Sequence, residues 1–241
     1  MNAEGLELLD RQNFVRRLRG EERERFHLKH SLNRLMFDGR MTKTQLRAWV
    51  INMFYYQLSI PMKDAAIISN CPVPEVRRFW ISRILEHDGY ASVEGGITGW
   101  LKLGEAAGIP REDMVSARFL PGVRFSVDSY VNFARTGTWV EGMAASLSDL
   151  FYEALAERVR AFEKHYRWVK SEGLGYFRSR LIQTKRDSNI ALDLVVRYCD
   201  TRELQKRAME AVGFKNDVLW SISDAIYTAY VVNQESLEAS V

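Results

Sequence analysis

The chain has 241 residues, carries 34 Lys and Arg against 31 Asp and Glu for a net charge of +3, and is 46% hydrophobic. So small an excess of positive charge excludes a dedicated nucleic-acid-binding protein, while the length and apolar content suffice for one folded domain. No apolar run approaches the roughly 20 residues that a membrane-spanning helix needs, and the acidic N-terminal segment lacks the layout of a secretory signal. We therefore expect a cytoplasmic protein that binds neither nucleic acid nor membrane.

Apolar residues recur at spacings of three and four along nearly the whole chain, and strict alternation is nearly absent. This period is typical of helices, so we predict a compact all-α bundle forming one domain over 1–241, with loosely ordered tails at 1–10 and 232–241. The predicted helices, in chain order, are Gln12–Leu18, Glu24–Phe37, Thr44–Ser69, Glu75–His87, Ile97–Ala107, Val123–Arg135, Val140–Lys164, Leu174–Lys185, Asn189–Cys199 and Arg202–Val231.

Local signals agree with these boundaries. Thr42 and Thr44 are candidate N-caps, and Pro74 stands where the first residue of a helix belongs. Gly89 is predicted to end the helix that Pro74 begins. Pro61 should kink the long helix around it, because proline cannot donate the i→i−4 hydrogen bond and its ring clashes with the preceding turn.

Several polar residues interrupt helices that are otherwise apolar, and they are candidates for a ligand site. Tyr56 and Gln57 precede a proline and Lys63 follows it, so a kink would re-aim these side chains. Tyr176 and Arg180 share a helix face at i,i+4 spacing. Together with the other polar residues on apolar helices, these side chains predict a cationic, hydrogen-bonding pocket inside the bundle. The other polar residues are His87, Tyr130, Ser148, Asp149 and Lys215.

The position of His87 also predicts its charge. It lies at the C-terminal end of its predicted helix, where the helix dipole favours the protonated imidazole.

Metal and thiol chemistry find little support in the sequence. Residues 24–27 match one half of the paired Glu-x-x-His motif of di-iron proteins, but the four histidines supply no second match, so we expect no metal. His27 and His30 could share a face, which leaves a metal there open. Cys71 and Cys199 lack zinc or redox spacing and are expected to be buried, although a thiol nucleophile would need only a base beside one of them.

Five segments in chain order resemble one known family. They are Tyr-Tyr-Gln…Ile-Pro-Met-Lys-Asp-Ala-Ala-Ile at 55–67, Arg-Ile-Leu-Glu-His-Asp-Gly at 83–89, Gly-Gly-Ile…Trp-Leu-Lys-Leu-Gly-Glu at 95–105, Pro-Gly-Val-Arg-Phe-Ser-Val-Asp-Ser-Tyr-Val-Asn-Phe-Ala-Arg at 121–135, and Tyr-Phe-Arg-Ser-Arg-Leu at 176–181. The match covers nearly all of the chain between His27 and Ala229. On these segments the chain resembles the pyrroloquinoline-quinone synthase family.

The resemblance implies a haem-oxygenase-like, thiaminase-II-like helical bundle, usually a homodimer, and an oxidase that uses no cofactor. Such an enzyme closes the last ring of a quinone precursor bearing several carboxylates, oxidises it with O₂ as co-substrate and releases hydrogen peroxide. By the same resemblance, the catalytic residues are His27, His87, Tyr130, Tyr176 and Arg180. The implied substrate-binding residues are Met53, Tyr56, Gln57, Lys63, Ser148, Asp149, Arg158 and Lys215.

Chemistry suggests roles within this set. His87 is suited to proton transfer, and the tyrosines can donate hydrogen bonds to oxyanions or hold O₂ over the ring. The Lys and Arg side chains are suited to the substrate carboxylates.

The chain departs from the family pattern at several positions. Met53 stands where we expect an arginine, Phe26 where a tyrosine would be usual, and Ser148 and Asp149 where we expect threonine and glutamate. The lost cation leaves a related aromatic acid open as the substrate. A metal-dependent oxygenase, a thiaminase-like hydrolase and a non-catalytic quinone carrier also stay open.

Overall fold

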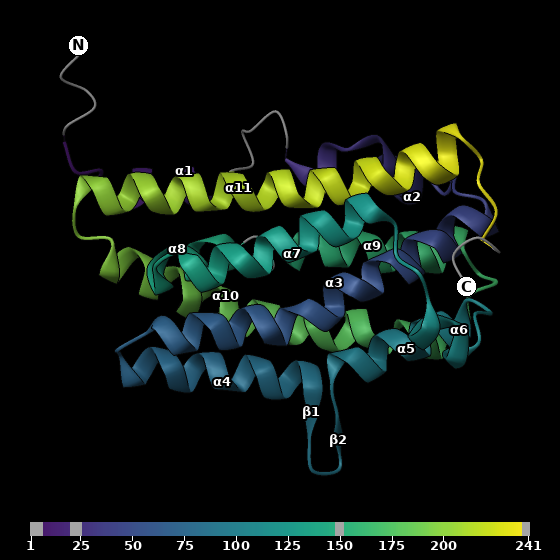
Figure 1. The fold of residues 1–241 in the computed structure, drawn as a ribbon, viewed down its shortest axis with the longest axis horizontal. Coiled ribbons are helices and arrows are strands. Elements are labelled where there is room, and N and C mark those ends of the chain that lie inside the picture. Colours follow the sequence, from purple (N-terminus) through teal and green to yellow (C-terminus); the bar gives the residue numbers. More distant parts are fainter. Residues whose placement is uncertain (1–6, 20–25, 148–151, 238–241) are drawn as a thin grey trace.

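Helix α3 (Lys43–Asn70) runs through the interior of the bundle, and other elements pack around it (Figure 1). Its neighbours include α4 (Pro74–Asp88), α5 (Gly96–Ala106) and α7 (Pro121–Thr136). The consecutive residues Ala48–Asn52 are all buried, so this stretch of α3 is enclosed on every side, as expected of a central helix rather than an amphipathic surface helix. The predicted all-α bundle is confirmed.

The structure is a computed structural model that describes residues 7–19, 26–147 and 152–237. Helix α11 extends along the bundle beside α7 and α8, and α10 packs against α9 and α5 (Figure 1). The elements not yet given are α1 (Arg11–Arg19), the 3₁₀ turn η2 (His27–Lys29), α2 (Ser31–Phe37), strands β1 (Gly89–Tyr90) and β2 (Val93–Glu94), α6 (Arg111–Ser116), α8 (Trp139–Ser146), α9 (Tyr152–His165), the 3₁₀ turn η4 (Ser171–Leu174), α10 (Gly175–Tyr198), α11 (Arg202–Tyr227) and the π-helical turn η5 (Thr228–Val232).

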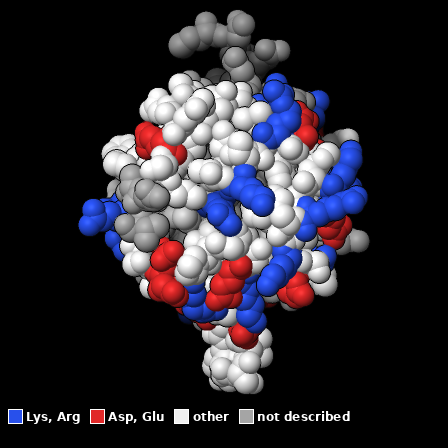
Figure 2. All heavy atoms as spheres, turned by 90° about the vertical axis from the view of Figure 1, so that its right-hand side faces the viewer, with Lys and Arg blue, Asp and Glu red and all other residues white. Residues whose placement is uncertain are grey.

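The surface carries charges of both signs. Figure 2 shows one end of the bundle, where acidic side chains lie among the basic ones. This mixture agrees with the small net charge of +3. Within the described ranges, no helix combines the length and the apolar character that crossing a membrane requires.

Three predicted helix boundaries are confirmed. Thr42 forms a capping box: its hydroxyl accepts the Gln45 backbone N–H, and the Gln45 side chain accepts the Thr42 backbone N–H. Pro74 is the first residue of α4. Gly89 ends that helix with φ +90°, and a Cβ there would lie 2.8 Å from the Val93 carbonyl oxygen. The chain then enters the β1–β2 hairpin, which projects from the bundle (Figure 1).

Other boundaries were predicted wrongly. The described part of Glu24–Phe37 is the turn η2 followed by α2, because the His30 Nδ1 atom accepts the Leu32 N–H and caps a new helix. The two helices predicted between 174 and 199 are one helix, α10, since neither proline nor glycine interrupts it. The hairpin and α6 were not predicted.

Three further predictions are not decided by the described residues. The long helix predicted at Val140–Lys164 corresponds to α8 and α9, and residues 148–151 between them lie outside the described residues. Within the predicted N-terminal tail, Leu9 exchanges two backbone hydrogen bonds with the Gln205 side chain, at 2.9 and 3.0 Å. Helix α3 continues through Pro61, and the kink there stays a prediction.

Candidate active site

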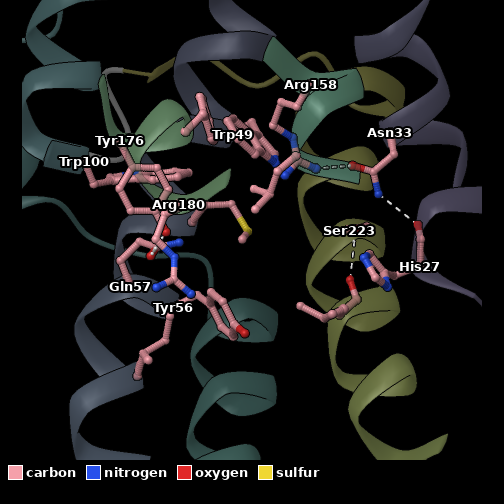
Figure 3. A pocket seen from close by; sticks show the side chains of 15 residues that line it. His27, Asn33, Trp49, Tyr56, Gln57, Trp100, Arg158, Tyr176, Arg180 and Ser223 are labelled. Carbon is pink, nitrogen blue, oxygen red and sulfur yellow. Dashed lines mark hydrogen bonds between the residues drawn. The ribbon is translucent and has the colours of Figure 1, made fainter. Parts of the chain in front are cut away.

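A cavity of about 120 Å³ lies inside the bundle, walled by side chains from η2, α2, α3, α5, α9, α10 and α11 (Figure 3). Seven of the predicted site residues line it, which are His27, Met53, Tyr56, Gln57, Arg158, Tyr176 and Arg180. Sequence reasoning missed the other lining residues, which are Asn33, Trp49, Ile60, Trp100, Leu155, Phe177, Leu219 and Ser223. Most of these are apolar residues of ordinary core type, so only the folded arrangement identifies them.

Two arginines supply positive charge to the wall. Figure 3 shows Arg158 beside Trp49, with its guanidinium 5.0 Å from that ring, and Arg180 beside Gln57. Burial lowers the pKa of Arg158 to about 10, which leaves it charged at neutral pH. Arg180 is buried and lies 4.0 Å from the Glu86 carboxylate. Guanidinium groups held in this way are suited to bind carboxylates in two-pronged fashion.

A second group of predicted residues lies buried behind the cavity wall. The Lys215 ammonium donates to the Tyr56 hydroxyl at 2.5 Å and lies 3.5 Å from the centre of the Tyr130 ring. The Tyr56 and Tyr130 rings are nearly parallel, 6.5 Å apart, so the ammonium contacts both aromatic rings. Lys63 donates to the Ser146 hydroxyl at 2.8 Å and lies 5.5 Å from the Tyr130 ring centre. Lys63 and Lys215 therefore form one buried cluster that includes Tyr56 of the cavity wall.

His87 lies in the last turn of α4, as predicted, but its predicted charge is wrong. Its side chain is buried, and its Nδ1–H donates to the Arg83 carbonyl oxygen at 3.3 Å. Burial, followed by the nearby Arg180 cation, lowers the pKa of His87 from 6.5 to about 3. Loss of hydration thus outweighs the helix end, whose effect is typically below about 2 kcal/mol. The imidazole is neutral at pH 7.

The neutral imidazole has one available proton acceptor. Since Nδ1 donates its hydrogen, Nε2 carries the lone pair. Within the described ranges this nitrogen is buried and makes no hydrogen bond. His87 is therefore equipped to accept a proton rather than to supply one before the reaction begins.

The residues that the open metal and thiol alternatives would use have the following surroundings in the described part of the chain. His27 pairs with Asn216 at 3.2 Å, while His30 bonds Asp224 and caps α2, so the two histidines have separate structural partners. No group of three His, Cys, Asp or Glu side chains suited to a metal occurs in the part of the chain that the structure describes. Burial raises the pKa of Cys199 to about 12 and also raises that of Cys71, and neither residue lines the cavity.

Two predicted substrate-binding residues, Ser148 and Asp149, lie outside the described residues. Lys63, His87, Tyr130 and Lys215 are described and buried but do not line the cavity. Their predicted contact with a ligand therefore stays a prediction.

The all-α bundle with a cationic cavity among its helices has the fold of the haem-oxygenase-like class. A solved domain of unknown function with a haem-oxygenase-like fold, from Shewanella denitrificans, superposes with a TM-score of 0.78 at 14% identity. The superposition covers 95% of this chain and 96% of that one. This likeness confirms the predicted fold.

The sequence comparisons identify the family. The TENA/THI-4/PQQC family model matches residues 15–225, so the chain belongs to that family. The pyrroloquinoline-quinone synthase of Cronobacter sakazakii is 50% identical over 211 residues, 87% of this chain and 84% of that protein. The enzyme of the same name from Pseudomonas aeruginosa is 47% identical over 224 residues, 92% of this chain and 89% of that protein. The resemblance seen in the sequence is thereby confirmed.

Proposed function

We propose that the protein is a pyrroloquinoline-quinone synthase. In this proposal it closes the last ring of a precursor with several carboxylates, oxidises it with O₂ and releases hydrogen peroxide, without a metal or organic cofactor. The observation that carries the proposal is the buried cluster of positive charge at the cavity, with Arg158 and Arg180 in the wall and Lys63 and Lys215 behind it. Buried cations of this kind favour a polyanionic ligand.

The chemistry that the proposal assigns to the residues follows from their protonation states. Each O₂ reduced to hydrogen peroxide takes two electrons and two protons, and the substrate supplies the electrons. Nε2 of His87 accepts a proton as the substrate is oxidised. A carboxylate bound at Arg180 offsets the cation that lowers the pKa of His87, so substrate binding makes the imidazole a stronger base.

The test is an anaerobic mixing experiment. The purified protein is mixed with the ring-open quinone precursor without O₂, and O₂ is then admitted while the absorbance spectrum, O₂ uptake and peroxide release are followed. We expect the finished quinone chromophore to appear with coupled uptake and release. Saturable binding without O₂ uptake would instead indicate a carrier, and activity lost on chelation and restored by a transition metal would indicate a metal-dependent oxygenase.

The expected homodimer belongs to the same proposal and is tested by sedimentation of the purified protein. A second candidate substrate is a related aromatic acid with fewer carboxylates. It is favoured by Met53, which places a neutral side chain in the cavity wall where the family pattern leads us to expect a cation. Comparing turnover of the two acids by the same protein separates these candidates.

A further inference from the structure

Asp64 is a fully buried carboxylate that contacts Lys63 of the buried cation cluster. It lies on α3 with no exposed surface. Its Oδ1 atom accepts hydrogen bonds from Lys63 Nζ at 2.5 Å and from the Trp80 indole N–H at 2.8 Å. Its Oδ2 atom lies 3.5 Å from Nε of Arg83. A buried carboxylate is costly unless it is paired, and this one contacts cations from two helices.

These contacts connect Asp64 to both halves of the candidate site. On one side, Lys63 also bonds Ser146 on α8 and faces the Tyr130 ring on α7. On the other side, the backbone carbonyl of Arg83 accepts the Nδ1–H of His87. The Asp64 carboxylate thus directly contacts Lys63, a proposed substrate-binding cation. Through Arg83 it is linked to His87, the proposed proton acceptor.

The charges around His87 show what this carboxylate does. Arg83 on α4 and Arg180 on α10 are cations that lower the pKa of His87, and Asp64 on α3 raises it. Glu86 on α4 lies 4.0 Å from Arg180, while the Tyr176 ring and the His87 ring both approach Gly96 of α5. The pKa of Asp64 is itself lowered, because Lys63 and Arg83 outweigh the opposing effect of its burial. Asp64 therefore carries a full negative charge at neutral pH.

We propose that Asp64 is a positioning residue of the oxidase: its carboxylate orients Lys63 toward the site and offsets the positive charge that surrounds His87. This inference rests on the proposed function. Asp64 does not line the cavity, so it acts through these two residues rather than on the substrate. The indole N–H of Trp80 holds the carboxylate in the orientation in which it acts on Lys63 and on His87.

Two variants separate the charge of Asp64 from its position. Asp64→Asn retains a side-chain oxygen that accepts from Lys63 and Trp80 but removes the charge. Trp80→Phe keeps the charge but removes the indole N–H that holds Oδ1. Both are compared with the wild type for kcat, for KM of the quinone precursor, for the pH profile of kcat and for affinity toward the finished quinone without O₂.

For Asp64→Asn we expect kcat to fall at least about tenfold, with the affinity for the quinone within roughly twofold of wild type. The acidic limb of the kcat profile should move to lower pH, because His87 loses the Asp64 charge that raises its pKa. For Trp80→Phe we expect a fall of roughly two- to tenfold with the acidic limb unmoved. A folded Asp64→Asn variant with wild-type kcat, or with an unmoved acidic limb, overturns the proposal.

If Asp64→Asn does not fold, the positioning role of Asp64 is tested by Trp80→Phe alone. Wild-type kcat in that variant overturns the proposal. A wild type that fails to convert the precursor contradicts the proposed function instead. The electrostatic role of Asp64 is then tested by histidine NMR of the two proteins with the quinone bound, in which His87 must titrate at lower pH in Asp64→Asn. Equal titration in both proteins overturns it.

Discussion

The hydroxyl of Tyr176 on α10 donates a hydrogen bond of 2.6 Å to the side-chain oxygen of Gln57 on α3, and both residues line the cavity. An amide offers one acceptor oxygen and one donor NH₂ group. Because Tyr176 occupies the oxygen, Gln57 is oriented to present its N–H donors. The pair therefore adds neutral donors to the arginine charges that an anionic ligand would meet.

The first prediction tests this pair with Tyr176→Phe. The ring keeps its edge-on contact with Trp100, 5.0 Å between centres, so we expect the free energy of unfolding to change by only about 1 kcal/mol. Loss of the hydroxyl should lower kcat by roughly ten- to a hundredfold, because Gln57 is released and an oxyanion donor is removed. Steady-state kinetics and thermal unfolding measure the two effects.

Tyr166→Phe is the matched control. The Tyr166 hydroxyl donates to the Met36 carbonyl at 3.0 Å, and the residue does not line the cavity. This variant should lose a similar amount of stability and retain wild-type kcat. Equal kcat losses in the two variants would show that Tyr176 acts only through stability.

The second prediction concerns Met53→Arg. Met53 is half-buried and lines the cavity, one helical turn before Gln57. A guanidinium there adds a charge-assisted hydrogen bond, typically worth about 1.5–3 kcal/mol, so affinity for a tricarboxylate quinone should rise roughly ten- to a hundredfold. The gain should shrink as salt is added.

Met53→Gln is the control, since it adds polarity without charge and should gain little. Titration calorimetry at two ionic strengths measures both variants. An unchanged or weaker affinity in Met53→Arg would mean that repulsion from Arg158 and Arg180 exceeds the new attraction. The native Met53 would then favour the related acid with fewer carboxylates.

The sequence was informative wherever a local rule decides the structure. The N-cap at Thr42, Pro74 at a first helical position and Gly89 at a helix end each depend on a few neighbouring residues, and each was predicted. The cap at His30 was missed, because an imidazole nitrogen accepting the N–H two residues on is not among the usual cap side chains. The hairpin β1–β2 was missed because two-residue strands show no alternation.

The residues of the candidate site also fall into those that the sequence identifies and those that only tertiary contacts identify. Residues such as Gln57 and Arg180 were found because a polar group on an apolar helix is visible in the sequence. Asn33 was missed because its role is tertiary: it accepts from Arg158 at 3.4 Å and donates to the His27 carbonyl. The charge of His87 was wrong for the same reason, since burial and Arg180 come from other elements.

The third prediction is that His87→Asn stalls the oxidation while leaving binding largely intact. His87 does not line the cavity, so the quinone should bind within a few-fold of wild-type affinity. Removal of a positioned proton acceptor typically costs about 10²–10⁴ in rate, and O₂ uptake should fall accordingly. Stopped-flow spectra after O₂ admission should show a partly oxidised species accumulating. Wild-type turnover in this variant would exclude proton transfer by His87.

The fourth prediction is a pH dependence of stability caused by His87. Its pKa is about 3 in the folded protein against an ordinary 6.5, so the unfolded chain takes up a proton below pH 6.5 that the folded protein does not accept until about pH 3. Uptake by the unfolded state alone destabilises the fold as pH falls, by about 1.4 kcal/mol per pH unit and at most about 5 kcal/mol in total.

Urea unfolding of the wild type and of His87→Gln at several pH values between 7.5 and 4 measures this effect. Glutamine does not titrate, so the wild type should lose stability relative to the variant as pH falls through this range. A constant difference between the two would show that His87 is not buried as a neutral group. Bound quinone should weaken the pH dependence, because its carboxylates at Arg180 raise the pKa of His87 in the folded state and bring it closer to the unfolded value.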